Sequence, residues 1–239
     1  QAVFREFFTP SGRLAIDTQA AYVVALKFGI YIDRNKIIEQ FKLRLKKDLN
    51  QIKCGFVGAP LLCTVLAEAG EYELAYDFLL KEGFPSWLYS VNLGATTIWE
   101  RWNSVLPDGS ISDTGMNSLN LYAYGSIVEW MYRSMAGINM CEDVPGFKKA
   151  VLAPKPDDRI EGVSARIKTA SGLYETGWKI AKDGEMEINV TIPFDCDAKL
   201  ILPYARKEEV LMNGALCMEG MQKEDTVELE LTSGTYRFT

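Results

Sequence analysis

A single glutamate is flanked by aromatic residues in a way that suits sugar chemistry. Glu100 lies between Trp99 and Trp102, in a run that begins at Thr97. The face of an aromatic ring suits a sugar because the axial C–H groups of a pyranose form an apolar patch that stacks on it. A carboxylate beside such a ring can protonate a glycosidic oxygen or activate a water molecule. The spacing alone leaves a second interpretation open, in which both tryptophans are core residues and Glu100 and Arg101 form a solvated pair.

The chain contains no histidine, which restricts the chemistry further. Histidine is the most common general base and metal ligand, so its absence excludes a Ser-His-Asp hydrolase and a histidine-bound metal centre for this chain by itself. The five cysteines form no CxxC pair, and we expect neither a zinc site nor a redox dithiol. Free thiols in a reducing compartment are predicted instead.

The composition is that of an ordinary globular protein, with 48% hydrophobic and 24% charged residues. A net charge of −6 argues against a nucleic-acid partner, because neutralising phosphates requires clustered lysine and arginine. No apolar run is long enough to cross a bilayer and no signal sequence is present, so no membrane association is predicted. The first eight residues look like the end of an interrupted helix and lack a starting methionine, which suggests a piece of a larger protein.

The elements that must position Glu100 are helices. Helical spacing of apolar residues predicts four of them, near residues 20–28, 37–49, 60–70 and 71–80. Asp17, in the pair Asp17-Thr18, is expected to cap the first helix, and Asp33 precedes the second. Pro60 suits the first turn of the third helix. A further helix is predicted over residues 119–136.

Residues 84–116 show no sustained period and are rich in Gly, Ser, Asn and Trp. A long irregular segment between helices is typical of a functional loop or of disorder. Disorder is not expected here, because Trp87, Trp99 and Trp102 carry too much apolar surface to leave in water. Asp113, in the same segment, fits either a structural role, as a helix cap or loop brace, or a place in the wall of a pocket.

After about residue 145 the period changes from 3.6 to 2, which predicts strands. The alternation covers residues 164–169, 174–181, 186–192, 209–212, 216–218, 226–231 and 235–238. Asp183-Gly184 and Asn213-Gly214 are hairpin turn signals between pairs of these strands. Helices followed by strands predict two domains, the second a small β-sandwich.

The helical part carries a series of motifs in a fixed order. GATTIWERWN at 94–103 is followed by DTGMNSLN at 113–120 and YAYG at 122–125, and is preceded by DTQ at 17–19, GFVG at 55–58 with Pro60, and PSWLY at 85–89. These runs resemble the catalytic half of bacterial α-L-rhamnosidases, glycoside hydrolase family 78. The matches keep their order across about residues 12–138, which is more specific than any single motif.

The resemblance implies a fold and a reaction. The fold is an (α/α)6 barrel followed by a β-sandwich, and the reaction is an inverting hydrolysis of terminal α-L-rhamnosides that uses no cofactor and no metal. About six helices make half of such a barrel. We therefore expect residues 1–143 to form the C-terminal half of the catalytic barrel and residues 144–239 to form the β-sandwich domain.

The resemblance also implies roles for particular residues. Glu100, in the TxWExW stretch, corresponds to the general base that activates water. The residues expected to bind the sugar are Trp87, Trp99, Trp102, Tyr89 and Asp113. The implied partner is a rhamnose-containing oligosaccharide or glycoside. The free thiols and the lack of a signal sequence predict a location in the bacterial cytoplasm.

Two features depart from the family pattern. The general acid belongs to an acidic motif on earlier barrel helices, and nothing in this chain resembles it. Inversion needs two carboxyl groups on opposite sides of the bond, so the chain is expected to be inactive alone. Leu121 stands where the family usually has a sugar-binding histidine. A half-barrel would also leave an apolar face exposed, which predicts self-association or association with the absent N-terminal half.

Three classes of function remain at this stage. The first is a carbohydrate hydrolase of which this chain is an incomplete part, and the retained Glu100 favours it. The second is a sugar-binding or regulatory relative that lost its chemistry, which Leu121 favours. The third is a structural scaffold without a site, and the aromatic-rich loop argues against it.

Overall fold

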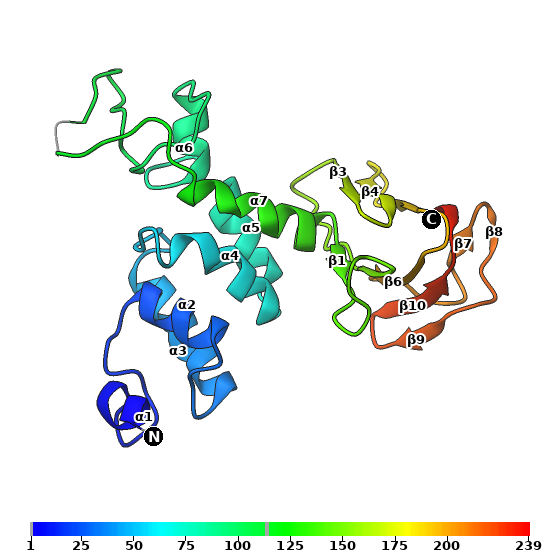
Figure 1. Cartoon of the computed structure of the whole chain (residues 1–239), viewed down its shortest axis with the longest axis horizontal. Helices are drawn as coiled ribbons and strands as arrows, with labels where there is room; N and C mark the ends of the chain where they lie inside the picture. Colours follow the sequence, from blue (N-terminus) through cyan, green and yellow to red (C-terminus); the bar gives the residue numbers. More distant parts are fainter. Residues whose placement is uncertain (1, 113–114) are drawn as a thin grey trace. The chain divides into compact units, whose positions relative to one another are not determined.

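Helices occupy the first part of the chain and strands the second, as predicted (Figure 1). The computed structural model describes residues 2–112 and 115–239. The chain divides into two compact units, Gln1–Val128 and Glu129–Thr239. Each unit has its own set of buried residues and is described by itself.

Within residues 2–92, which the structure describes without a gap, the helical unit contains six α-helices. Their bounds are α1 Ala2–Phe7, α2 Gln19–Lys27, α3 Arg34–Lys47, α4 Ala59–Glu68, α5 Tyr72–Leu80 and α6 Trp87–Asn92. Helix α2 packs against α3 and α4, and α4 packs against α5. Apolar residues at helical spacing along α3, among them Ile37, Phe41 and Leu45, are almost fully buried, which is the stripe expected of a helix with one wet face.

The ends of these helices are fixed by side chains. The Thr18 hydroxyl accepts the N–H of Ala21 at 3.3 Å, so Thr18 caps α2 and the prediction for Asp17 is wrong. Asp17 accepts the Tyr22 hydroxyl at 3.0 Å instead. The Asp33 carboxylate caps α3.

A buried glutamine ties the start of α2 to the end of α3. The Gln19 amide donates to the Asp48 carboxylate at 2.9 Å and to the Gln51 carbonyl at 2.7 Å. Its oxygen accepts the N–H of Lys53 at 2.9 Å. Every polar atom of this side chain is therefore matched, which is what makes its burial tolerable.

Two helix predictions needed correction. Helix α6 lies inside the segment expected to be irregular; it is only six residues long, too short to show a period, and the Ser86 hydroxyl caps it. The final helix was expected from residue 119, but helical structure begins at 123, with η1 Ala123–Ser126, α7 Ile127–Trp130 and a π turn, η2 Met131–Met135. Residues 118–121 are not helical because the N–H groups of Ser118 and Leu121 bond to Glu100 and Ile98 instead of to a preceding turn of helix.

The second unit is a pair of β-sheets. One sheet has the order β1-β2-β6-β10-β9 and the other β3-β4-β5-β11-β7-β8. The strands are β1 Ile138–Met140, β2 Lys149–Leu152, β3 Gly162–Thr169, β4 Gly172–Ile180, β5 Met186–Ile192, β6 Asp197–Pro203, β7 Leu211–Met212, β8 Ala215–Leu216, β9 Met221–Lys223, β10 Thr226–Leu231 and β11 Gly234–Phe238.

The sequence pattern identified most of these strands but not all. Strands β1, β2 and β9 have only three or four residues, too few for a visible alternation, and β6 was also missed. The predicted hairpins are confirmed: β4 and β5 pair antiparallel across Asp183-Gly184, and β7 pairs with β8 across Asn213-Gly214. Asn213 and Gly214 both have positive φ, of 54° and 82°, as a two-residue turn between strands requires.

The core of the second unit lies between the sheets and includes Tyr174, Trp178, Leu200 and Leu229, each at most 2% exposed. The polar side-chain atoms of Trp178 and of its neighbour Thr176 form hydrogen bonds. The Trp178 indole N–H donates to the Met135 carbonyl at 2.7 Å, and the Thr176 hydroxyl donates to the Ala136 carbonyl at 2.7 Å.

Candidate active site

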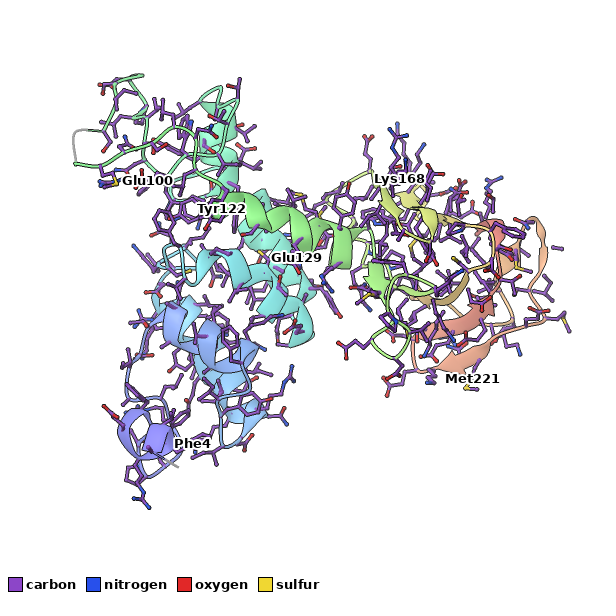
Figure 2. The ribbon with its side chains drawn as sticks, in the orientation of Figure 1. Phe4, Glu100, Tyr122, Glu129, Lys168 and Met221 are labelled. Carbon is purple, nitrogen blue, oxygen red and sulfur yellow. The ribbon has the colours of Figure 1, made fainter. Side chains whose placement is uncertain are left out.

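Glu100 is held by a segment eighteen residues further along the chain. Its backbone N–H donates to the Ser118 carbonyl at 2.8 Å. In return, the Ser118 N–H donates to the Glu100 Oε2 atom at 2.7 Å. The N–H of Leu121 donates to the Ile98 carbonyl at 2.8 Å, so residues 98–100 and 118–121 lie side by side. Figure 2 shows Glu100 among the loops of this unit.

A cavity of about 370 Å³ opens beside Glu100. It is lined by residues from four parts of the helical unit, namely Gly55, Phe56, Phe84, Glu100, Arg101, Trp102, Asn103 and Tyr124. Among the predicted site residues, Glu100 and Trp102 therefore line the same cavity. A half-buried carboxylate beside aromatic rings is an arrangement that can take a sugar.

The indole of Trp102 is fixed by two other aromatic rings. It stacks on Tyr124 with ring centroids 3.9 Å apart and an interplanar angle of 14°. Trp87 meets it edge-on at 5.2 Å and 88°. The Trp87 indole N–H donates to the Tyr124 carbonyl at 2.8 Å, which ties all three residues together.

Three other predicted sugar-binding residues, Trp87, Trp99 and Tyr89, are not among the residues that line the cavity. Trp87 and Trp99 are each 7% exposed, so in this chain both pack as core residues. Tyr89 contacts Phe84 edge-on at 5.5 Å, and its hydroxyl donates to the Val105 carbonyl at 3.3 Å. Asp113 lies outside the described residues.

Three aromatic lining residues were not predicted as site residues. Phe56 and Phe84 are about half exposed, at 47% and 49%, and Tyr124 is the ring beneath Trp102. Phe56 and Tyr124 belong to the motifs GFVG and YAYG, which were noted for their resemblance only. An aromatic residue within such a motif was the signal that could have identified Phe56 and Tyr124, whereas Phe84 lies just before PSWLY and belongs to none of the motifs.

Burial raises the pKa of the Tyr124 phenol in the cavity lining, with smaller contributions from Cys54 and Glu100. The phenol is therefore protonated at neutral pH. Within residues 2–112 and 115–239, no cluster of three or more Cys, Asp or Glu side chains has the geometry to hold a metal ion. No helix in the same residues has the length and hydropathy to span a membrane.

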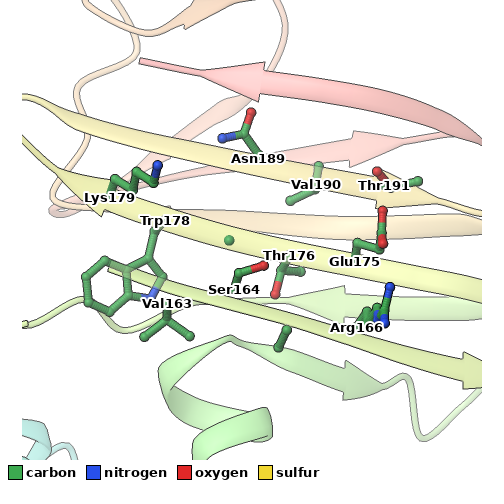
Figure 3. A pocket seen from close by; sticks show the side chains of 12 residues that line it. Val163, Ser164, Arg166, Glu175, Thr176, Trp178, Lys179, Asn189, Val190 and Thr191 are labelled. Atoms are coloured by element: carbon green, nitrogen blue, oxygen red, sulfur yellow. The ribbon is translucent and has the colours of Figure 1, made fainter. Parts of the chain in front are cut away.

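A second hollow, of about 460 Å³, lies on the β3-β4-β5 sheet of the other unit (Figure 3). Gly177 leaves room at its centre, between Ser164 of β3 and Asn189 of β5. Its polar lining mixes charges of both signs, including Arg166, Glu175 and Lys179. Trp178, which also borders it, is 1% exposed and belongs to the core. This hollow therefore offers no exposed ring for a sugar, unlike the cavity at Glu100.

Two family models match this chain, one over its helical part and one over most of its β-strands. The model of the bacterial alpha-L-rhamnosidase six-hairpin glycosidase domain matches residues 1–135. The model of the bacterial alpha-L-rhamnosidase C-terminal domain matches residues 137–215. The two family models meet near residue 136, and the two compact units meet between residues 128 and 129. The domain boundary between residues 143 and 144 stays a prediction.

Individual relatives agree with the family models. An alpha-L-rhamnosidase of Alteromonas sp. is 41% identical over 189 residues, which is 78% of this chain and 20% of that protein. One from Formosa agariphila is 34% identical over 245 residues, 98% of this chain and 26% of that protein. The crystal structure of Streptomyces avermitilis alpha-L-rhamnosidase complexed with L-rhamnose superimposes with a TM-score of 0.88 at 30% identity, covering 99% of this chain and 23% of that one. The chain thus spans about a quarter or less of the length of these relatives.

Proposed function

This chain belongs to the bacterial α-L-rhamnosidase family, and we propose that it is the C-terminal part of an enzyme that hydrolyses terminal α-L-rhamnosides. Its Glu100 would act as the general base. The observation that supports this role best is the position of Glu100 on a cavity that Trp102 and Tyr124 also line. The fixed hydrogen bond from Ser118 to one carboxylate oxygen adds to it.

The proposed step is a single displacement with inversion. Ser118 occupies Oε2 of Glu100, which leaves Oε1 to accept a proton from a water molecule. That water attacks the anomeric carbon as the bond to the leaving oxygen breaks, and a general acid protonates the leaving oxygen. The general acid would come from the part of the enzyme that precedes this chain.

The sugar would lie against the aromatic side of the cavity. Trp102 is the predicted sugar-binding residue that lines it, and Tyr124 supports its ring. Trp87 would act through Trp102, which it contacts edge-on. Direct roles for Trp99, Tyr89 and Asp113 remain proposals carried by the family resemblance alone.

The partner of the helical unit would be the preceding half of the barrel. Large apolar side chains exposed on this unit include Phe28 at 67%, Ile32 at 64% and Leu49 at 77%. Burying such side chains stabilises an assembly by about 25 cal/mol per Å² of apolar surface. We expect the isolated chain to self-associate, and sedimentation that shows a stable monomer would count against the half-barrel arrangement.

The test of the proposed function uses the whole enzyme and an aryl α-L-rhamnoside. The wild-type enzyme should release aryl alcohol, and NMR of the first sugar formed should show inverted anomeric configuration. Glu100→Gln should lower turnover by at least about 100-fold, whereas Glu82→Gln, a change at an exposed glutamate of the same unit, should not. Release of sugar with retained configuration would contradict the mechanism.

A second function, sugar binding without hydrolysis, is favoured by Leu121 at the position where the family usually has histidine. Leu121 is half-buried and its N–H is used by Ile98. Rhamnose binding by calorimetry, combined with no turnover of any aryl rhamnoside, would support this alternative.

A further inference from the structure

We infer that Ser104 and Asn117 are positioning residues that hold Glu100 in place through a closed circuit of hydrogen bonds. This inference rests on the proposed role of Glu100 as a base. Neither side chain lines the cavity, so neither is a substrate contact.

Ser104 fixes the backbone on one side of Glu100. Its side chain is 0% exposed. The Ser104 hydroxyl oxygen accepts the N–H of Arg101 at 3.0 Å, and the hydroxyl lies 3.1 Å from the Arg101 carbonyl, to which it donates. The turn that follows Glu100 is therefore closed by this buried hydroxyl together with the Ser104 N–H, which donates to the Arg101 carbonyl at 3.2 Å.

Asn117 connects that turn to the segment that holds the carboxylate. Its amide nitrogen donates to the Ser104 carbonyl at 3.1 Å and reaches the Ser112 carbonyl at 3.5 Å. The next residue, Ser118, exchanges two hydrogen bonds with Glu100, one of them to Oε2. The circuit therefore runs from Glu100 through the turn to Ser104, then to Asn117, and back through Ser118.

This circuit matters because little else holds the carboxylate. Among residues 2–112 and 115–239, Ser118 supplies the hydrogen bond to the Glu100 side chain, and no other described donor does so. A base must keep its oxygen within a few tenths of an ångström of the productive position. A displacement of 1 Å can cost about 100-fold in rate, so loosening Ser118 should lower kcat.

The substitution Asn117→Asp tests the inference with almost no change of shape. It replaces the donating amide nitrogen by an oxygen that faces the Ser104 carbonyl. The hydrogen bond is therefore lost, and the two oxygen atoms repel each other. The matched control is Asn120→Asp, the same change on an exposed residue three positions away. Ser104→Ala is the second variant, and it removes the hydroxyl at the other end of the circuit.

The assay is hydrolysis of an aryl α-L-rhamnoside by the whole enzyme, with and without azide. Azide is an anion that attacks the anomeric carbon as the aryl oxygen leaves, and it needs no base to remove a proton. It therefore reports on a misplaced base in an otherwise intact pocket. We expect Asn117→Asp to lower kcat about 10- to 100-fold with KM within about twofold, and azide to restore turnover as the rhamnosyl azide. Ser104→Ala should show the same pattern more weakly.

Three results would overturn the inference. The first is an Asn117→Asp enzyme with kcat within about threefold of the Asn120→Asp control. The second is a loss of kcat that azide does not relieve, which would indicate a general structural role. The third, if Asn117→Asp does not fold, is normal kcat in Ser104→Ala. Failure of the proposed function would give different results. The wild-type enzyme would not hydrolyse the aryl rhamnoside with inversion, or Glu100→Gln would keep its turnover.

Discussion

The indole ring of Trp102 lies flat on the phenol ring of Tyr124, with their centroids 3.9 Å apart and their planes inclined by 14°. The two residues come from separate segments of the chain, and both line the cavity that contains Glu100. The stack therefore connects the loop of the proposed base to the turn that leads into α7. It fixes the ring on which we expect the sugar to lie.

Removing the ring beneath Trp102 should weaken substrate binding. An aromatic pair contributes about 0.5–1.5 kcal/mol beyond the area it buries. We expect Tyr124→Leu in the whole enzyme to raise KM for an aryl α-L-rhamnoside by about 2- to 12-fold, since 1.4 kcal/mol corresponds to a factor of ten. Tyr124→Phe keeps the stack and should leave KM close to wild type. Equal effects of the two variants in steady-state kinetics would argue against the stack as the cause.

The buried amide of Gln19 should be needed for stability rather than for chemistry. Gln19→Leu removes its three hydrogen bonds and leaves the Gln51 carbonyl and the Lys53 N–H without their partner. An unmatched buried polar group costs about 1–3 kcal/mol. Thermal unfolding should show a clear drop in Tm, with kcat unchanged at temperatures where the variant is folded. An unchanged Tm would mean that water replaces the amide at no cost.

The Thr176 hydroxyl should stabilise the β-unit through its bond to the Ala136 carbonyl. Thr176→Val keeps the shape and removes the donor, so the carbonyl is left buried and unpaired. We expect a loss of about 1–3 kcal/mol in the free energy of unfolding, measured by urea denaturation. Thr191→Val is the matched control, because that hydroxyl bonds to Thr235 on the exposed side of the sheet at 3.3 Å. The control should lose less than about 0.5 kcal/mol.

Glu228 should make the β-unit more stable at neutral pH than in acid. Hydrogen bonds from Lys199 and Lys223 hold the pKa of this carboxyl below its usual value. A lowered folded-state pKa gives stability that is present above the unfolded pKa of about 4.3 and is lost as pH falls through the folded value.

The lysines of this cluster are exposed to solvent, by 31% and 52%, so the stabilisation is limited to about 0.2–1 kcal/mol per pair. Glu228→Gln should therefore lower the free energy of unfolding at pH 7 and have little effect near pH 2. Glu219→Gln, at an exposed position, is the control. A difference between Glu228→Gln and wild type that grows toward acid pH would have the wrong sign for this account.

The sequence predicted helices and strands correctly where their pattern of apolar residues is long enough to be recognised. The apolar stripe of α3 and the alternation of β4 and β5 extend over several turns or residues, and both were predicted. Helix α6 spans less than two turns, and strands β1, β2 and β9 have only three or four residues, which is too short to show a period. Strand β6, with seven residues, was also missed. The final helix starts late because residues 118–121 bond to the Glu100 segment, a tertiary contact that no local propensity reveals.

The candidate site was predicted only in part, because spacing in the sequence relates only residues that are close along the chain. Glu100 and Trp102 are close in the sequence, so their spacing indicated a shared surface. Phe56, Phe84 and Tyr124 reach the cavity from other segments, and only the fold brings them there. The circuit of Ser104, Asn117 and Ser118 was not predicted either. Asn117 and Ser118 belong to the DTGMNSLN motif, but a motif does not show which backbone groups its side chains contact in the fold.

The most direct test of this account is the ratio of kcat/KM between Glu100→Gln and Glu82→Gln in the whole enzyme acting on an aryl α-L-rhamnoside. General base catalysis contributes about 10²- to 10⁴-fold. We predict that Glu100→Gln lowers kcat/KM by at least about 100-fold relative to Glu82→Gln, with the folded structure and rhamnose affinity retained. Equal values of kcat/KM in the two variants would contradict the assignment of Glu100 as the base.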